Sequence, residues 1–356
     1  MINHSVFRIA TTAQFEVALS EQHYYAFEES KTPMNRKQRV LDWLLEPNQP
    51  AVRYRTLLDL LEHSQDSHEV RRAKANITRV GWAHDILKSQ KPEGHWESRS
   101  DLYRPKYSAT IWRLIVLSDL ALTKKEPRIR RPCEMFLNEY HRGDGGFDTP
   151  GSNWSRSELC LTGNLARTLT LCGYDEDTRV LSAFDWLVKN QMEDGGWHCM
   201  YERAFGRGTL DCWEGLSAFA VLSREKWTRR IKRCINNGAE FYLNRKLLRQ
   251  GRSYRPWFRL HYPVHYYYDL LVGLDVITAL GYAGDQRLKP ALQLLERKRL
   301  PDGTWALDAI HPDLGIGAGY RFKKRPRRFA LEKQGKPSKW ITLTALRVLK
   351  RVEDAT

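Results

Sequence analysis

Residues Gln191-Met192-Glu193-Asp194-Gly195-Gly196-Trp197 form the pattern Q-x-x-x-G-x-W, and the same pattern occurs at 90–96. Variants that keep the glycine and an aromatic residue lie at 141–147 and 299–305, and a degenerate copy lies at 247–251. The anchoring glycines follow one another at intervals of 50–56 residues: Gly94, Gly145, Gly195, Gly251 and Gly303. A period of this length indicates a chain built from repeated structural units.

Each glycine turn separates two segments whose apolar residues have helical spacing. The segment before the turn is amphipathic and charged, as at 70–90, 128–140, 178–191, 229–247 and 286–299. The segment after it is more apolar, as at 107–122, 159–174, 210–224, 266–282 and 340–352. With a shorter pair at 39–46 and 51–62, the pattern predicts an all-α protein of about six helix pairs, with the polar helices outside. We expect one domain over 36–356, preceded by a partly ordered extension over 1–35.

The glycine turn itself has a structural explanation. Glycine accepts the left-handed backbone that ends a helix, and the aromatic ring two residues later can cover the turn. The glutamine at the start can bond to backbone groups that the helix leaves free. We therefore expect the turns to hold the helices in place and the chemistry to lie elsewhere.

The composition limits the partners and the compartment. The net charge is +16, which favours anionic partners, and basic residues cluster at 226–233 and 321–328. Few aromatic residues interrupt these clusters, so nucleic acid is disfavoured, and contact with a membrane surface is the alternative. The six cysteines form no C-x-x-C pair, and no apolar run is long enough to span a membrane. We expect reduced thiols and a cytoplasmic protein, with peripheral membrane contact as an option.

The turns at 90–96 and 191–197 resemble the repeats of squalene–hopene and oxidosqualene cyclases, and a similar unit occurs in the β subunits of protein prenyltransferases. The resemblance covers residues 39–354 and looks closest to short proteins with a single ring of helix pairs. It implies an (α/α)6 toroid, in which inner and outer helices surround an apolar cavity for an isoprenoid chain.

The stretch Asp211-Cys212-Trp213-Glu214 is similar to the D-C-T-A-E stretch of oxidosqualene cyclases. The resemblance implies that Asp211 is a proton donor with Cys212 as its hydrogen-bonding neighbour. Such a donor needs a protonated carboxyl in an apolar pocket, where burial raises its pKa. Trp213 and Glu214 depart from the family pattern, and the alternative role for Asp211 is to cap an inner helix.

The segment 263–274 looks like the P-Y-H-T-x-Y-x-L-x-G-L segment of protein prenyltransferases, whose histidine binds zinc. The resemblance implies an alternative metal site of Asp211, Cys212 and His265, with zinc as the cofactor. Neighbouring residues on a helix point about 100° apart, so this site needs a non-helical start. The main hypothesis requires no metal or cofactor. Aromatic faces from three tyrosines could stabilise a carbocation: Tyr266, Tyr267 and Tyr268.

Two inner segments share the pattern D-x-x-x-G-L, which places Asp211 and Asp269 at equivalent positions and makes Asp269 a second catalytic candidate. Other substrate-binding candidates lie near the starts of the inner helices: Tyr107, Trp213, Lys339 and Trp340. Helix N-termini gather there and favour a phosphate group, so a diphosphate on the substrate is an option.

Three functions remain open from these residues. The first is an enzyme, a lyase or isomerase that cyclises a polyprenyl or terpenoid substrate by protonation. The second is a zinc-dependent transferase of prenyl groups. The third is a toroid that binds a lipid or another protein without catalysis. The sequence sets no oligomeric state.

Overall fold

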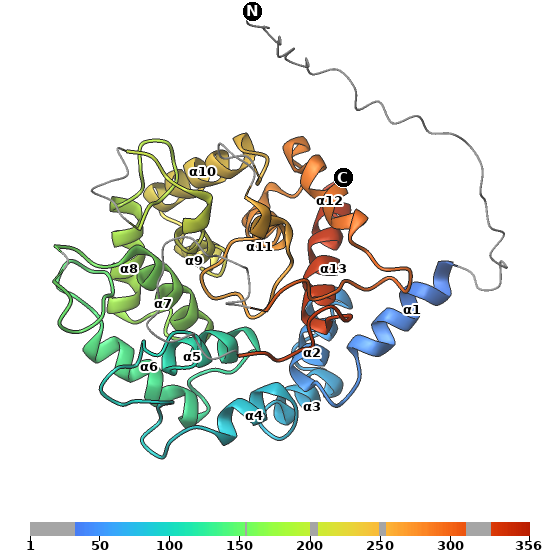
Figure 1. Ribbon diagram of the computed structural model, residues 1–356, viewed down its shortest axis with the longest axis horizontal. Coiled ribbons are helices and arrows are strands. Elements are labelled where there is room, and N and C mark those ends of the chain that lie inside the picture. Colours follow the sequence, from blue (N-terminus) through green and yellow to red (C-terminus); the bar gives the residue numbers. More distant parts are fainter. Residues whose placement is uncertain (1–32, 154, 200–205, 249–253, 311–328) are drawn as a thin grey trace, which may run out of the picture.

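The computed structural model describes residues 33–153, 155–199, 206–248, 254–310 and 329–356. Over these segments the chain is helical, and it has no β-strand beyond isolated bridges. The helices form a closed ring of two layers (Figure 1). The all-α toroid predicted from the sequence is therefore confirmed.

The inner layer surrounds the axis of the ring (Figure 1). Its helices are α2 (Pro50–Arg55) with η1 (Thr56–Leu60), α5 (Thr110–Asp119), α7 (Leu159–Leu171), α9 (Glu214–Phe219), α11 (Leu270–Ile277) with η6 (Thr278–Tyr282), and α13 (Lys339–Glu353). The most apolar of these helices, α5, α7 and α11, are buried along most of their length, as the sequence pattern predicts.

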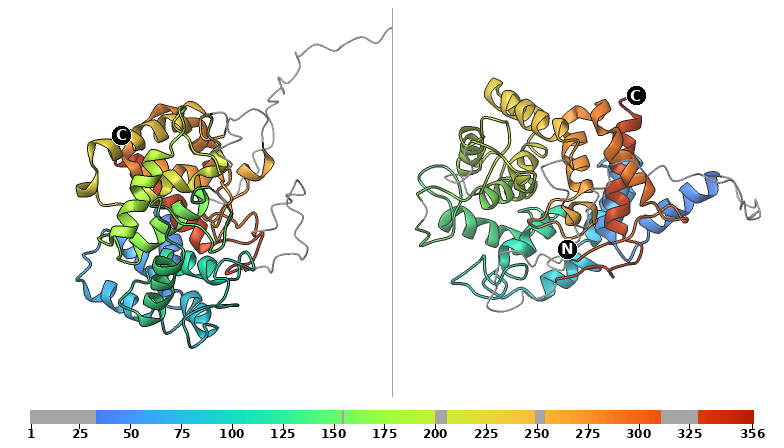
Figure 2. Two further views of the ribbon diagram at one scale, coloured as in Figure 1. Left: turned by 90° about the vertical axis from the view of Figure 1, so that its left-hand side faces the viewer. Right: turned by 45° about the horizontal axis from the view of Figure 1, so that its top comes forward.

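The outer layer alternates with the inner one along the chain and covers it from outside (Figure 2). Its helices are α1 (Pro33–Leu44), α3 (His68–Asn76) with α4 (Trp82–Lys88), α6 (Pro127–Glu139), α8 (Thr178–Lys189), α10 (Arg229–Asn244), and η7 (Gln286–Leu288) with α12 (Lys289–Arg297). The short η3 (Leu210–Cys212), η4 (Arg224–Lys226) and η5 (Arg255–Phe258) lie in the connections. The ring closes where α13 packs against α1, α2 and η1.

Some predicted boundaries differ from the observed ones for local reasons. Residues 33–35, assigned to the extension, begin α1. The segment 70–90 is two helices, because Gly81 has φ +80° and a side chain there would meet the carbonyl oxygen of Asn48. The last inner helix but one starts at Leu270, since Asp269 caps its first turn.

Two of the glycine turns, at 90–96 and 191–197, share a set of hydrogen bonds that joins neighbouring outer helices. The Gln191 amide donates to the carbonyl of Gly195 at 2.9 Å and to that of Cys234 on α10 at 2.8 Å. The Gln90 amide bonds in the same way to Gly94 and to Arg128 on α6. The indole N–H of Trp197 donates back to α8, at Leu187, over 3.0 Å. The copy at Gly251 lies outside the described residues.

The sequence predicts two features of the surface, namely two clusters of basic residues and no membrane-spanning segment. In the first basic cluster, Lys226 pairs with Asp175 at 2.7 Å and with Glu176 at 2.6 Å, so part of its charge is neutralised. The second cluster, 321–328, lies outside the described residues. Among the helices that the structure describes, none is both long and apolar enough to cross a bilayer.

Candidate active site

A pocket of about 240 Å³ runs along the axis of the toroid, and all six inner helices contribute to its wall. The side chains that line the pocket become more exposed from the N-terminal to the C-terminal ends of these helices. The side chains of His261 and Asp269, beside the start of α11, are 0% and 1% exposed, whereas those of Asp275 and Arg351 are 26% and 31% exposed. The pocket therefore has a closed inner end at the starts of the inner helices and a mouth at their C-terminal ends.

An aspartate and a histidine meet at the closed inner end. Asp269 is the N-cap of α11, and its Oδ1 accepts a hydrogen bond from the backbone N–H of Val272 at 2.9 Å. Its Oδ2 accepts the backbone N–H of His261 at 2.9 Å and lies 2.6 Å from the His261 ring Nδ1. This arrangement assigns the ring proton to Nδ1. The other ring nitrogen, Nε2, is buried and has no hydrogen-bond partner among the described residues.

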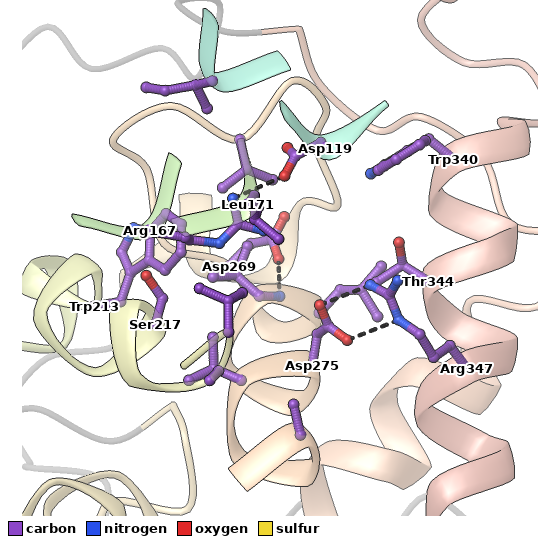
Figure 3. Close-up of a pocket in the computed structure, with 18 of the residues that line it drawn as sticks. Asp119, Arg167, Leu171, Trp213, Ser217, Asp269, Asp275, Trp340, Thr344 and Arg347 are labelled. Carbon is purple, nitrogen blue, oxygen red and sulfur yellow. Dashed lines mark hydrogen bonds and ion pairs between the residues drawn. The ribbon is translucent and has the colours of Figure 1, made fainter. Parts of the chain in front are cut away.

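Two indole rings stand on either side of Asp269 in the pocket wall (Figure 3). Trp340, in the first turn of α13, stacks on Tyr262 with ring centroids 4.7 Å apart. Trp213, just before α9, donates its indole N–H to the carbonyl of Tyr266 at 3.2 Å. The stacking on Tyr262 holds Trp340, and the hydrogen bond to Tyr266 holds Trp213, so each ring has a fixed position beside the pocket.

The mouth is charged. Arg167 pairs with Asp119 at 2.8 Å, and Arg347 pairs with Asp275 at 2.9 Å (Figure 3). Burial opposes the ionisation of Asp275, but Arg347 and Arg351 outweigh it and lower its pKa to about 2. The expectation of an apolar cavity does not hold at the mouth, because ion pairs form its wall.

The first catalytic candidates, Asp211 and Cys212, lie outside the wall of this pocket. Asp211 is exposed, and its Oδ1 accepts the indole N–H of Trp257 at 2.7 Å. Surrounding protein atoms raise the pKa of its carboxyl, and the bond from Trp257 opposes this rise. Cys212 is buried, and its Sγ lies 3.4 Å from the Sγ of Cys199.

His265 and Tyr107 form an aromatic cluster of their own. Their rings stack with centroids 5.7 Å apart, and Phe329 lies on His265 at 6.4 Å. Burial lowers the pKa of His265 to about 3, so its ring is neutral at ordinary pH. Tyr266 packs its ring edge on Trp112 and shares a hydrogen bond with the hydroxyl of Tyr103.

The remaining candidates lie outside the pocket wall. The hydroxyl of Tyr268 donates to the carbonyl of Leu247 at 2.9 Å, in the core of the toroid. Tyr267 is half-buried. Lys339 is almost fully buried, and its ammonium contacts the carbonyl of Trp43 and pairs with Glu46 at 2.9 Å. Lys339 therefore joins α13 to α1.

The structure does not gather the alternative zinc ligands. Asp211 is directed at Trp257, and His265 lies between Tyr107 and Phe329, so neither joins Cys212 in a single site. Among the described residues, one group of three potential ligands lies within 4.8 Å, and it consists of Cys160, Cys199 and Cys212.

Sequence reasoning missed two buried groups. His261 lies four residues before His265, and the motif comparison selected His265 because it stands at the family position. Glu214 lies three residues after Asp211 and is fully buried, with neither carboxyl oxygen bonded to another described residue. A search for acidic or histidine residues inside apolar stretches would have found Glu214, whereas His261 stands in a loop and has no such signal.

No protein-family model and no curated protein matches the chain. Among solved structures, a protein from Actinoplanes is 14% identical over 90% of this chain and 99% of its own, with a TM-score of 0.49. The type II terpene cyclase MstE from Scytonema is 15% identical over 90% of this chain and 98% of its own, with a TM-score of 0.44. A variant of MstE in complex with geranylgeranyl dihydroxybenzoate, described as its substrate, is 16% identical over 90% and 97%, with a TM-score of 0.43. The all-α toroid is defined by the arrangement of this chain's own helices.

Proposed function

We propose that this protein is an enzyme that rearranges or cyclises a small isoprenoid-type substrate by acid–base catalysis in the axial pocket. The observation that carries the proposal is His261, a residue of the pocket wall whose buried Nε2 has no hydrogen-bond partner among the described residues. In this scheme His261 transfers the proton, and Asp269 is a positioning residue.

The hydrogen bonds of Asp269 support this division of roles. Its two oxygens accept N–H groups from Val272 and from the backbone and ring of His261. These three N–H donors hold the Asp269 side chain, and Asp269 in turn holds the ring of His261 in one orientation. Nε2 then gives a proton to the substrate, or takes one from it, at the closed end.

The chemistry of an imidazolium narrows the substrate class. It is a much weaker acid than a carboxylic acid, so it suits a basic oxygen, as in an epoxide, better than a bare alkene. Protonation of an epoxide oxygen opens the C–O bond and leaves positive charge on carbon. The faces of Trp213 and Trp340 would stabilise that charge through their quadrupoles.

The size and the charge of the pocket add two further limits. A volume of about 240 Å³ is slightly below the usual range of roughly 300–1,000 Å³ for small-molecule sites, which favours a short isoprenoid chain. The ion pairs that Arg167, Arg347 and Arg351 form at the mouth favour a substrate with a polar group at its outer end. An amphiphilic molecule with its reactive end innermost fits both limits.

The test uses His261→Asn, whose side-chain amide can keep the bond to Asp269 while removing Nε2. The wild-type chain is incubated with the terminal epoxides of farnesol and farnesyl diphosphate, and products are identified by mass spectrometry. We expect conversion by the wild type and a loss of kcat/KM of about 10²–10⁴-fold in the variant, the range typical of general acid–base catalysis. His84→Ala, on the outer helix α4, is the matched control and should keep full activity.

Two outcomes would overturn the proposal. One is conversion by His261→Asn at the wild-type rate, with both proteins showing the same circular dichroism and melting temperature. The other is recovery of every epoxide unchanged from the wild type although it binds with measurable affinity. The second outcome would favour a toroid that binds lipids without catalysis.

A further inference from the structure

Three cysteine sulfurs converge near the starts of the inner helices, apart from the wall of the axial pocket. Cys160 is in the first turn of α7, Cys199 follows the turn at 191–197, and Cys212 ends η3. Their three sulfur atoms lie within 4.8 Å of one another. In this structure Cys160 and Cys199 form a disulfide, and Cys212 remains a thiol. The expectation of reduced cysteines is therefore wrong for this pair.

The spacing of the sulfurs suits a metal ion once the disulfide is reduced. Zinc binds thiolates at about 2.3 Å in tetrahedral geometry, which separates two bound sulfurs by roughly 3.8 Å. Cys199 and Cys212 have their sulfurs 3.4 Å apart, and the third sulfur lies within reach of both. A metal could therefore enter after a modest movement of these side chains.

Burial raises the pKa of the Cys212 thiol well above its ordinary value, so a metal ion would have to displace its proton. Two other features of the surroundings favour metal binding. Cys160 stands in the first turn of a helix of 13 residues, where the helix dipole stabilises a negative charge. The backbone N–H of Cys199 donates to the Sγ of Cys212 at 3.3 Å. Bonds of this kind orient metal ligands from the second coordination sphere. Cys199 is half-buried, whereas Cys160 and Cys212 are buried.

We propose that the reduced chain binds one Zn²⁺ ion through Cys160, Cys199 and Cys212, and that disulfide formation abolishes the site. Reduction by an external dithiol transfers two electrons and two protons to the Cys160–Cys199 bond, and the dithiol becomes a disulfide. Binding then forms three Zn–S bonds and releases the three thiol protons. The ion joins the start of α7 to the connection before α9, and this role is independent of the axial pocket.

The test titrates the full chain with Co²⁺ as a spectroscopic probe and then displaces it with Zn²⁺. The protein is reduced with a phosphine under anaerobic conditions before the titration. We expect one equivalent of Co²⁺ with a sulfur-to-metal charge-transfer band, and stoichiometric loss of that band on adding Zn²⁺. Cys212→Ser and Cys160→Ser should each weaken binding at least tenfold, whereas Cys234→Ala, a buried cysteine of α10, should bind like the wild type.

Several results would overturn the site. The reduced wild type could show no charge-transfer band at one equivalent, or Cys212→Ser and the wild type could titrate alike. Binding that persists after the Cys160–Cys199 disulfide is re-formed would also contradict it. Circular dichroism of each variant excludes unfolding as the cause, and none of these readouts depends on catalytic activity.

Discussion

At the scale of single residues, Glu214 has the chemical character that the sequence assigned to Asp211. It is fully buried, and neither of its oxygens is bonded to another described residue. Burial raises the pKa of its carboxyl well above the ordinary value of 4.5, and the negative charges of Asp211 and Glu158 add to the effect. Glu214 therefore keeps its proton to a higher pH in the folded protein than in the unfolded one.

Glu214→Gln should change how stability depends on pH. Above pH 4.5 the unfolded wild type releases this proton while the folded state keeps it, so folding stability falls as pH rises. Glutamine has no proton to lose. The free energy of unfolding of the variant should therefore rise relative to that of the wild type by up to about 1.4 kcal/mol per pH unit in this range. Urea unfolding of both proteins at pH 4, 5, 6 and 7 measures the difference. A constant difference over these pH values would contradict a neutral Glu214.

The candidate site could be predicted only in part, for a reason that belongs to single side chains. Helical spacing placed Asp269 and both tryptophans near the starts of inner helices, where the structure also has them. It could not give side-chain direction in the loops. His261 and His265 lie four residues apart, yet one belongs to the pocket wall beside Asp269 and the other stacks on Tyr107.

At the scale of elements, the glycine turns at Gly94, Gly145, Gly195 and Gly303 each contact the next outer helix of the ring. Gly195 has φ +86°, and a Cβ there would lie 2.3 Å from the carbonyl oxygen of Asn237 on α10. A side chain at this position would therefore be opposed twice, by the left-handed backbone and by the contact with a carbonyl group of a helix. Gly143, in the neighbouring repeat, has open space around it and no positive φ.

Gly195→Ala should therefore lower the free energy of unfolding by at least about 2 kcal/mol. Gly143→Ala is the matched control and should stay within about 0.5 kcal/mol of the wild type. Denaturant unfolding of the two variants and the wild type measures both values. Equal losses at the two positions would show that the turn does not depend on its left-handed glycine.

The helices and their pairing were predictable because the sequence contains two periods. Helical spacing separates inner from outer segments, and the interval between glycines sets the number of pairs. The sequence did not predict the break between α3 and α4, because a single glycine within a helical pattern is compatible with a continuous helix. The break follows from the approach of Gly81 to Asn48, which is a tertiary contact.

At the scale of the whole molecule, α13 is the last inner helix, and it closes the ring by packing between α11 and the first inner helix, α2 with η1. Arg347 on α13 pairs with Asp275 on α11 at 2.9 Å and with Asp59 in η1 at 3.2 Å. One guanidinium therefore holds together three inner elements that lie far apart in the sequence. Arg351 binds the same Asp275 at 2.8 Å, so that carboxylate keeps one partner if Arg347 is removed.

Arg347→Met keeps most of the side-chain length but leaves Asp59 and Asp275 with less compensation. Breaking a buried ion pair from one side costs roughly 3–5 kcal/mol, and the 18% exposure of Arg347 and the remaining Arg351 should reduce this to about 2–3 kcal/mol at pH 7. Lys350→Met is the control on the same helix; its ammonium pairs with exposed carboxylates of Glu62 and Asp354, and we expect little change.

The cost of Arg347→Met should also depend on pH, with a sign that follows from Asp275. Its pKa is lowered to about 2 in the folded wild type, so the stability it contributes is present above its ordinary value of 3.8 and is lost as pH falls toward 2. The gap between wild type and variant should therefore shrink in acid, below about pH 4. Urea unfolding at pH 7, 5, 4 and 3 measures this gap. A gap that stays constant or widens in acid would mean that Arg347 acts by packing alone, and that the ring closes without its ion pairs.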